Sequence, residues 1–383
     1  MTDDFPPSPA LLPAGLSDLL PPDAETEAAS VAALMEVFAS HGYERVKPPL
    51  LEFEDGLFAG AGAATAEQTF RLMDPESQRM MGLRADTTPQ VARIAATRLA
   101  AAPRPLRLSY AGQCLRVRGS QLAPDRQIAQ AGIELIGPDS PAADAEIVLV
   151  GAAALAALGL ARVSFDLTLP SLVPLLLEDA GMSGPARAAL ARALDRKDAH
   201  EVARHGGALA PVLTELLMAA GPADRALAAL ADAALPLKAR ALAERLAATI
   251  AALRARAPEL RLTVDPVEFR GFRYETGISV TVYAPGRNGE LGRGGRYMVN
   301  EAEPATGLTL YPDAIIRCCP PRPGRPRCFV PWGAPDEAAA RLRRQGFATV
   351  ASLDPAPDDA LAEARRLACT HILRDGAALK LPS

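Results

Sequence analysis

The sequence predicts an α+β fold in which a mostly antiparallel sheet is flanked by helices. Strand-like segments recur at residues 106–117, 130–136, 162–169, 260–272 and 276–282, often separated by polar or Gly/Pro turns. Residues 170–258 instead are rich in Ala, Leu, Arg and Asp with apolar residues at helical spacing, which predicts a helical insertion. Towards the C-terminus short strands and helices alternate, as in a small α/β domain.

The composition is that of an ordinary globular protein. The chain has 383 residues, of which 49% are hydrophobic and 22% charged, enough for two or three domains with a sizeable core. Its net charge of -4 argues against a broad basic surface for nucleic acid.

Several function classes are not expected. The N-terminal residues lack the pattern of a secretion signal, and no stretch approaches the roughly 20 apolar residues that span a bilayer, so we expect a cytoplasmic protein with no membrane partner. The five cysteines form no CxxC pair and the four histidines show no metal-ligand spacing. We therefore expect no cofactor, no metal and no disulfide framework.

The first elements are a helix and an extended segment. Residues 24–42 place Val31, Leu34 and Phe38 at helical spacing, and Gly42 closes the helix. The next segment, YERVKPPLLEFED, is extended but carries two adjacent prolines, which indicates a sheet edge or an interface.

The strand at 130–136 has an unusual polar face. Alternation directs Ala131, Ile133 and Leu135 to one side and Gln130, Gly132 and Glu134 to the other. An amide and an acid thus flank a glycine gap, and this face meets either water or a ligand.

We divide the chain at its composition changes. Residues 1–319 form the core, with the insertion at 170–258 inside it; the Pro-rich residues 320–327 form a linker, and 328–383 form the small α/β domain with helices at 336–345 and 358–368.

Four polar clusters lie in otherwise core-like segments: LRADTT at 83–88, LRVR with QAGIE at 115–134, EFRGFRYETG at 268–277 and GELGRGGRY at 289–297. Alternation in the third places Arg270 and Tyr274 on one face, where they can share a cavity with Gln130 and Glu134. Such a set suits a zwitterion, because an acid and an amide receive an ammonium while an arginine fork holds a carboxylate. Surface ion pairs or structural hydrogen bonds are the alternative for each residue, and GRGGRY lacks the order of a phosphate loop.

Taken in order, these clusters resemble the catalytic core of histidyl-tRNA synthetase, a class II synthetase, over about residues 1–317. The resemblance rests on LPAGLSDLLPPDA, GYERVKPPLLE, LRADTT, the second class II motif at the LRVR cluster, RGFRY and GGRY. It implies a class II synthetase-like antiparallel sheet.

The resemblance also implies a set of histidine-binding residues. Asp86, Thr88 and Gln130 correspond to residues around the α-amino group, and Glu134 to the acid that faces the imidazole. Arg116 and Arg270 correspond to the arginines beside the carboxylate, and Tyr274 to the first tyrosine of the histidine-specific motif. Glu275 and Arg273 depart from that motif, which weakens imidazole specificity.

The positions that contact ATP in the synthetases depart further from the synthetase pattern. Arg118 stands for an acid of the second motif, Pro124 for its later arginine, Ile128 for the phenylalanine that stacks on adenine, and Ala314 for the arginine of the third motif. Tyr311 replaces the second glycine of the third motif. Charged hydrogen bonds contribute roughly 1.5 to 3 kcal/mol each, so losing two arginines weakens ATP binding about 100-fold or more. We expect that adenylate formation, and any catalytic role, has been lost.

This pattern is similar to the regulatory subunits of ATP phosphoribosyltransferase, the first enzyme of histidine biosynthesis. That likeness implies a non-catalytic chain that activates a short catalytic subunit, self-associates as a dimer within a hetero-oligomer, takes histidine as feedback effector and binds no tRNA. Two alternatives remain: a divergent synthetase or ligase that activates an amino acid with ATP, and a structural partner without a ligand.

Overall fold

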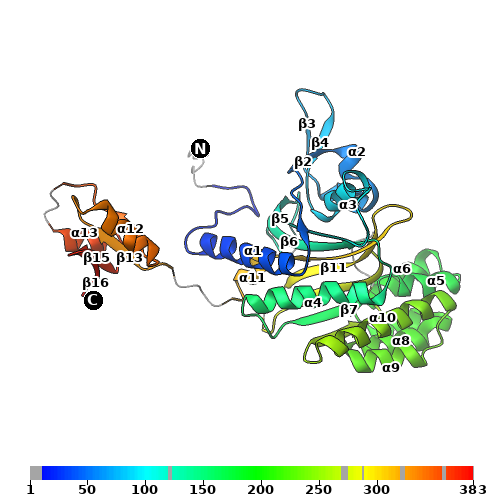
Figure 1. The fold of residues 1–383 in the computed structure, drawn as a ribbon. Helices are drawn as coiled ribbons and strands as arrows, with labels where there is room; N and C mark the ends of the chain where they lie inside the picture. Colours follow the sequence, from blue (N-terminus) through cyan, green and yellow to red (C-terminus); the bar gives the residue numbers. More distant parts are fainter. Residues whose placement is uncertain are drawn as a thin grey trace, which may run out of the picture. The chain divides into compact units, whose positions relative to one another are not determined.

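The computed structural model describes residues 11–119, 123–268, 275–286, 289–319, 324–355 and 359–382 (Figure 1). The chain divides into two compact units, Met1–Pro320 and Pro321–Ser383. Each unit has its own sheet and its own core, so the two are treated separately.

A nine-stranded sheet forms the centre of the first unit, in the order β1-β5-β6-β12-β11-β10-β7-β9-β8. Its strands are β1 (Glu44–Arg45), β5 (Leu106–Leu115), β6 (Gln127–Ile136), β7 (Ser164–Thr168), β8 (Gly221–Pro222), β9 (Arg261–Asp265), β10 (Glu275–Tyr283), β11 (Glu290–Met298) and β12 (Pro304–Leu310). Among the described pairings of this sheet, only β1 with β5 and β7 with β9 are parallel. The prediction of a mostly antiparallel sheet is therefore confirmed. The strand predicted at 260–272 is present as β9, which ends at Asp265; residues 269–272 of that prediction lie outside the described residues.

The segment expected as one extended strand at 43–55 is divided between two sheets. Its first part is β1, whereas β2 (Leu51–Phe53) joins a small sheet of order β2-β4-β3, with β3 at Arg71–Met73 and β4 at Met80–Leu83. Pro48 and Pro49 lie at the division, because a residue without a backbone N–H cannot continue a ladder. This sheet, with α2 (Glu54–Leu57), projects beside α3 (Thr88–Thr97) in Figure 1.

Helices cover both faces of the central sheet. Helices α1 (Asp23–Ser40) and α4 (Pro141–Ala157) lie along one face, where Phe38 and Ile147 join Ile133 in the main apolar cluster (Figure 1). On the other side of the sheet, Val91 of α3 packs in a second cluster with Tyr297 of β11. The alternation of β6 thus directs Ile133 to the α1/α4 core and Glu134 to the α3 side.

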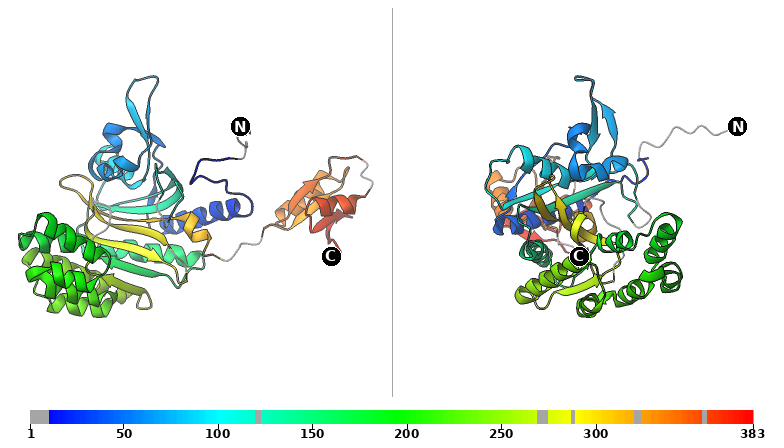
Figure 2. Two further views of the ribbon diagram at one scale, coloured as in Figure 1. Left: turned by 180° about the vertical axis from the view of Figure 1, so that it is seen from behind. Right: turned by 90° about the vertical axis from the view of Figure 1, so that its right-hand side faces the viewer.

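A group of helices lies between β7 and β9 in the chain and beside the sheet in space (Figure 2). It consists of α5 (Leu172–Asp179), α6 (Gly184–Asp195), α7 (Ala199–His205), α8 (Ala210–Ala219), α9 (Ala223–Asp232) and α10 (Leu237–Arg256), together with the short turn η2 (Gly207–Leu209). The buried side chains of Leu190, Leu213 and Leu246 belong to the main core, so this group packs as part of the first unit.

A buried ion network ties α10 to the sheet. Asp144 of α4 accepts hydrogen bonds from Arg296 of β11, at 2.7 and 3.0 Å, and from Arg245 of α10 at 3.0 Å. The Asp144 and Arg296 side chains are only 3% and 6% exposed, whereas that of Asp139, which also contacts both arginines, is 62% exposed. A buried charge needs such partners, because an unpaired one is costly in a low-dielectric interior.

The second unit is a small α/β structure. Its sheet has the order β14-β13-β15-β16, formed by β13 (Arg327–Val330), β14 (Ala348–Ala351), β15 (His371–Arg374) and β16 (Ala377–Lys380). Alternation places Val330 in one apolar cluster with Leu342 of α12 (Asp336–Arg344), and Phe329 in another with Ala364 of α13 (Ala360–Arg366). The two helices therefore cover opposite faces.

Candidate functional site

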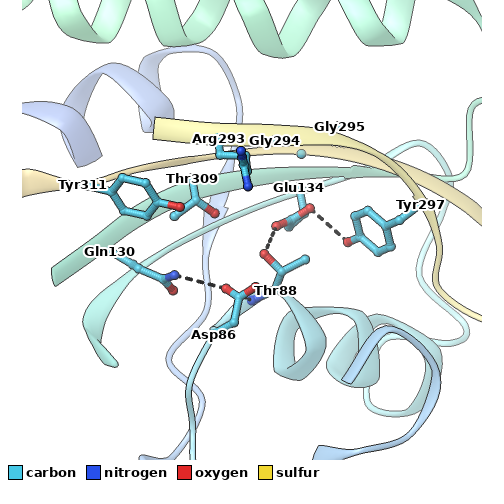
Figure 3. A pocket seen from close by; sticks show the side chains of 11 residues that line it. Asp86, Thr88, Gln130, Glu134, Arg293, Gly294, Gly295, Tyr297, Thr309 and Tyr311 are labelled. Atoms are coloured by element: carbon cyan, nitrogen blue, oxygen red, sulfur yellow. Dashed lines mark hydrogen bonds between the residues drawn. The ribbon is translucent and has the colours of Figure 1, made fainter. Parts of the chain in front are cut away.

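A cavity lies on the α3 side of the central sheet, between the start of α3 and strands β6, β11 and β12 (Figure 3). The space between its walls, including the mouth, is about 350 Å³. The lining residues are Asp86, Thr88, Gln130, Glu134, Arg293, Gly294, Gly295, Tyr297, Gly307, Thr309 and Tyr311. Carboxyl, amide and hydroxyl groups dominate this lining, so the cavity suits a small, polar molecule.

Glu134 of β6 is the most deeply buried acid of this cavity, with 1% of its surface exposed. One carboxyl oxygen accepts hydrogen bonds from the Thr88 hydroxyl at 2.9 Å and the Tyr110 hydroxyl at 3.3 Å, and the other from the Tyr297 hydroxyl at 2.9 Å. Figure 3 shows Glu134, Tyr297 and Thr88 converging from β6, β11 and the start of α3. Hydroxyls donate without carrying charge, so no cation in this set neutralises the carboxyl group.

The protonation of Glu134 follows from that environment. Burial raises the pKa of Glu134 to about 8, although the three hydroxyl donors oppose the shift. Burial prevails because it penalises the carboxylate more than neutral donors stabilise it. At pH 7 the Glu134 side chain is thus mostly protonated, and a ligand carrying a ring N–H or a positive charge can ionise it.

A second acid, Asp86, lies near Gln130 (Figure 3). Asp86 is 4% exposed and accepts a hydrogen bond from the Gln130 side-chain amide at 3.1 Å and from the backbone N–H of Thr88 at 3.4 Å. The Gln130 carbonyl in turn accepts from the Thr87 backbone N–H and from the Cys114 thiol. Because both of its ends are engaged, Gln130 is held in one orientation beside the carboxyl group of Asp86.

Glycines on the neighbouring strands create the space above the acids. Gly307 of β12 is paired with Glu134 across the sheet, and a Cβ at Gly307 would overlap the Glu134 carboxyl group. Gly294 of β11 lies similarly close to the β12 backbone. The run GELGRGGRY is therefore part of a strand and not a phosphate loop. Its glycines allow the neighbouring strand to approach closely and leave space for the cavity.

The structure brings four of the seven predicted site residues into this one cavity: Asp86, Thr88, Gln130 and Glu134. Arg116 instead lines the neighbouring cavity, where its side chain donates to the Ala85 carbonyl at 3.5 Å. Arg270 and Tyr274 lie outside the described residues.

Sequence reasoning did not assign several residues of the cavity. Tyr297 and Arg293 belong to the polar cluster at 289–297, whose glycine-rich pattern does not single them out as ligand contacts. Thr309 and Tyr110 share a hydrogen bond of 2.6 Å beside Glu134. Strand alternation was the available signal, since Arg293, Gly295 and Tyr297 are at every second position of β11.

A larger cavity adjoins the first. The space between its walls, including the open mouth, is about 1130 Å³. The lining includes Pro124, Ile128 and Ala314, three of the positions where a synthetase would contact ATP. Arg118, the fourth, lines a further cavity together with Arg116. Three acids, Asp125, Glu290 and Asp313, also line the larger cavity, and burial raises the pKa of Asp313.

Neither a metal-binding cluster nor a membrane-spanning helix is present among the described residues. Among them, no three His, Cys, Asp or Glu side chains are grouped closely enough to hold a metal ion. Within the same ranges no helix has the length and apolar character to cross a membrane.

Comparison with known proteins agrees with this architecture. A family model described as histidyl-tRNA synthetase matches residues 15–315. An ATP phosphoribosyltransferase regulatory subunit from Paramagnetospirillum magneticum is 57% identical over 95% of this chain and 96% of its own length. One from Gluconobacter oxydans is 55% identical over 98% of both chains. The chain belongs to the ATP phosphoribosyltransferase regulatory subunit family.

This ATP phosphoribosyltransferase regulatory subunit family member also has the expected fold. A solved structure described as an ATP phosphoribosyltransferase regulatory subunit/histidyl-tRNA synthetase from Bacillus halodurans matches with a TM-score of 0.79 at 24% identity, over 94% of this chain and 97% of that one. The prediction of a class II synthetase-like α+β fold is thus confirmed.

Proposed function

We propose that this chain is a non-catalytic regulatory subunit of ATP phosphoribosyltransferase, acting in the cytoplasm at the first step of histidine biosynthesis. In this role it activates a short catalytic subunit, assembles with it as a dimer within a hetero-oligomer, and transmits feedback inhibition by histidine. Neither a cofactor nor tRNA takes part.

The observation that carries the proposal is the pairing of two buried acids in one small cavity. Asp86 beside Gln130 suits an ammonium group, and Glu134, with its raised pKa, suits the imidazole of histidine. Thr88 links the two acids, since its backbone N–H donates a hydrogen bond to Asp86 and its hydroxyl donates one to Glu134. Arg116, Arg270 and Tyr274 remain in the proposed histidine site through the family resemblance.

The neighbouring cavity supports the loss of synthetase chemistry. Where a synthetase would stack adenine and grip phosphates, this cavity offers Ile128, Pro124 and Ala314, and it adds three acids that would repel a triphosphate. Arg116 and Arg317 are its only cations among the described lining residues, and Arg317 lies 3.7 Å from Asp125. We therefore propose that ATP binds only to the catalytic partner.

The direct test is to add the purified chain to a short ATP phosphoribosyltransferase catalytic subunit and to measure product formation with and without histidine. Activation together with histidine inhibition supports the proposal. Absence of any activation, for a complex that forms in solution, refutes it.

The alternatives give different outcomes. A divergent synthetase would catalyse histidine-dependent exchange between ATP and pyrophosphate, which we expect to be absent. A ligand-free structural partner would still activate the catalytic subunit, but the Glu134→Ala and Arg270→Ala variants would then leave histidine inhibition unchanged.

A further inference from the structure

Tyr311 lies between the two cavities of the first unit. Of the described lining residues, it is the one that the small cavity beside Glu134 shares with the larger cavity beside Ala314. In Figure 3 its ring enters from the end of β12, near Gln130, with the hydroxyl directed towards the interior of the small cavity. Glu134 and Tyr297 occupy the other end.

The charges around Tyr311 also come from both sides. Burial raises the pKa of its hydroxyl, and negative charge adds to the shift from Glu290 of the larger cavity and from Asp86 of the small one. Arg116, on the larger cavity, acts in the opposite direction. The phenol is thus close enough to charged groups of each cavity for them to shift its pKa.

The backbone holds Tyr311 in place. Its N–H donates to the Leu291 carbonyl at 2.8 Å, and its carbonyl accepts from the N–H groups of Ala314 and Ile315, both at 3.0 Å. Ile315 is fully buried. The ring therefore projects from the short junction between β12 and α11 (Pro312–Ile316) and not from a long loop. Strand pairing and the burial of Ile315 hold this junction in place.

We propose that Tyr311 is a specificity-determining residue. Its ring is a partition that closes the small cavity at the end opposite Glu134. The cavity then accepts a free amino acid but excludes any derivative extended at the carboxyl group. This inference rests on the proposed function and deepens it. If Asp86 and Gln130 hold the ammonium and Glu134 the imidazole, the ligand's carboxyl group lies at the Tyr311 end. There the phenol donates to the carboxylate and its ring fills the path that a substituent would need.

The partition has a functional consequence. A feedback site should respond to the free amino acid and not to activated or conjugated forms of it. Besides its charged residues, the larger cavity has an apolar part of its lining, with Ile128, Leu291 and Ala314, which would accept an aromatic substituent if the ring were removed. Removing Tyr311 is therefore expected to join the two cavities into one cleft.

The test compares L-histidine with L-histidine β-naphthylamide, in which the carboxyl group carries a two-ring aromatic amide, by calorimetric titration of the full chain. The wild-type chain and the Tyr311→Phe variant should bind histidine and bind the naphthylamide at least 100-fold more weakly. In Tyr311→Ala and Tyr311→Leu, naphthylamide affinity should rise at least tenfold over wild type. Cys318→Ala, which alters the larger cavity alone, should behave as wild type.

Thermal melting confirms that each variant is folded. Wild-type binding of the naphthylamide within threefold of histidine would overturn the partition. So would folded Ala and Leu variants that bind histidine yet still exclude the naphthylamide, or that lose both ligands. A wild-type chain that does not bind histidine overturns the proposed function itself, so the two failures are distinguishable.

Discussion

Replacing Glu134 by Gln should remove a large pH dependence from the stability of the empty chain. Burial raises the pKa of Glu134 to about 8 in the folded state, against about 4.5 when unfolded. Between these values the folded state holds one more proton than the unfolded state, so the free energy of unfolding falls as pH rises. The interval of about 3.5 pH units corresponds to about 5 kcal/mol at most, fully lost above pH 8.

Urea unfolding at pH 5.5, 6.5 and 7.5 measures this effect. Relative to Glu134→Gln, the wild-type chain should lose about 2 to 3 kcal/mol between pH 5.5 and 7.5, because the slope approaches 1.4 kcal/mol per pH unit. Glutamine keeps the size of the side chain and cannot ionise, so any hydrogen bond it loses shifts stability equally at every pH. Every other titrating group is shared by both chains and cancels in the difference.

Identical pH slopes in the two chains would refute the reasoning, because they would mean that Glu134 is ionised in the fold across the range. Saturating histidine provides a further check. A ligand that supplies a cation or a ring N–H stabilises the carboxylate, so the wild-type slope should flatten when histidine is present.

Two more predictions follow from the buried contacts. Asp144→Ala should lower the free energy of unfolding by about 3 to 5 kcal/mol, because it removes the buried carboxylate partner of Arg296 and leaves only the exposed Asp139. Asp139→Ala, which alters that exposed partner, should cost less than about 1 kcal/mol. Equal losses in urea unfolding would contradict this account. Gly307→Ala should lower the free energy of unfolding by about 1 to 3 kcal/mol, because the added methyl group overlaps the Glu134 carboxyl group. The same overlap should abolish histidine binding in calorimetry. Unchanged affinity would mean that the ligand binds elsewhere.

Much of the fold could be predicted because local pattern and tertiary position agree. The alternation in β6 was sufficient to separate Ile133, in the core, from Glu134, in the cavity, since a strand in a two-faced sheet must follow a period of two. The two prolines near residue 48 marked an interruption correctly. Their result, two strands in different sheets, depends on partners distant in the chain and had no local signal.

The candidate site was predictable where motif residues were already polar in apolar surroundings. Asp86 and Gln130 are 44 positions apart in the chain, and the family resemblance assigns both to one site, in agreement with the hydrogen bond between them. Tyr110 and Thr309 could not be predicted from the sequence, because tyrosine and threonine are common in strands. Only the pairing of β5, β6 and β12 brings their hydroxyl groups close to Glu134. Position in the fold, not residue type, makes them part of the site.

The most direct test of the central claim is the histidine inhibition curve of a reconstituted ATP phosphoribosyltransferase assembly, measured with wild-type chain and with Asp86→Asn. Both chains should activate the catalytic subunit equally. The variant should need roughly 10- to 100-fold more histidine for half-inhibition, because it loses a charge-assisted hydrogen bond to the ammonium group worth about 1.5 to 3 kcal/mol. Superimposable inhibition curves would contradict the claim that this cavity senses histidine.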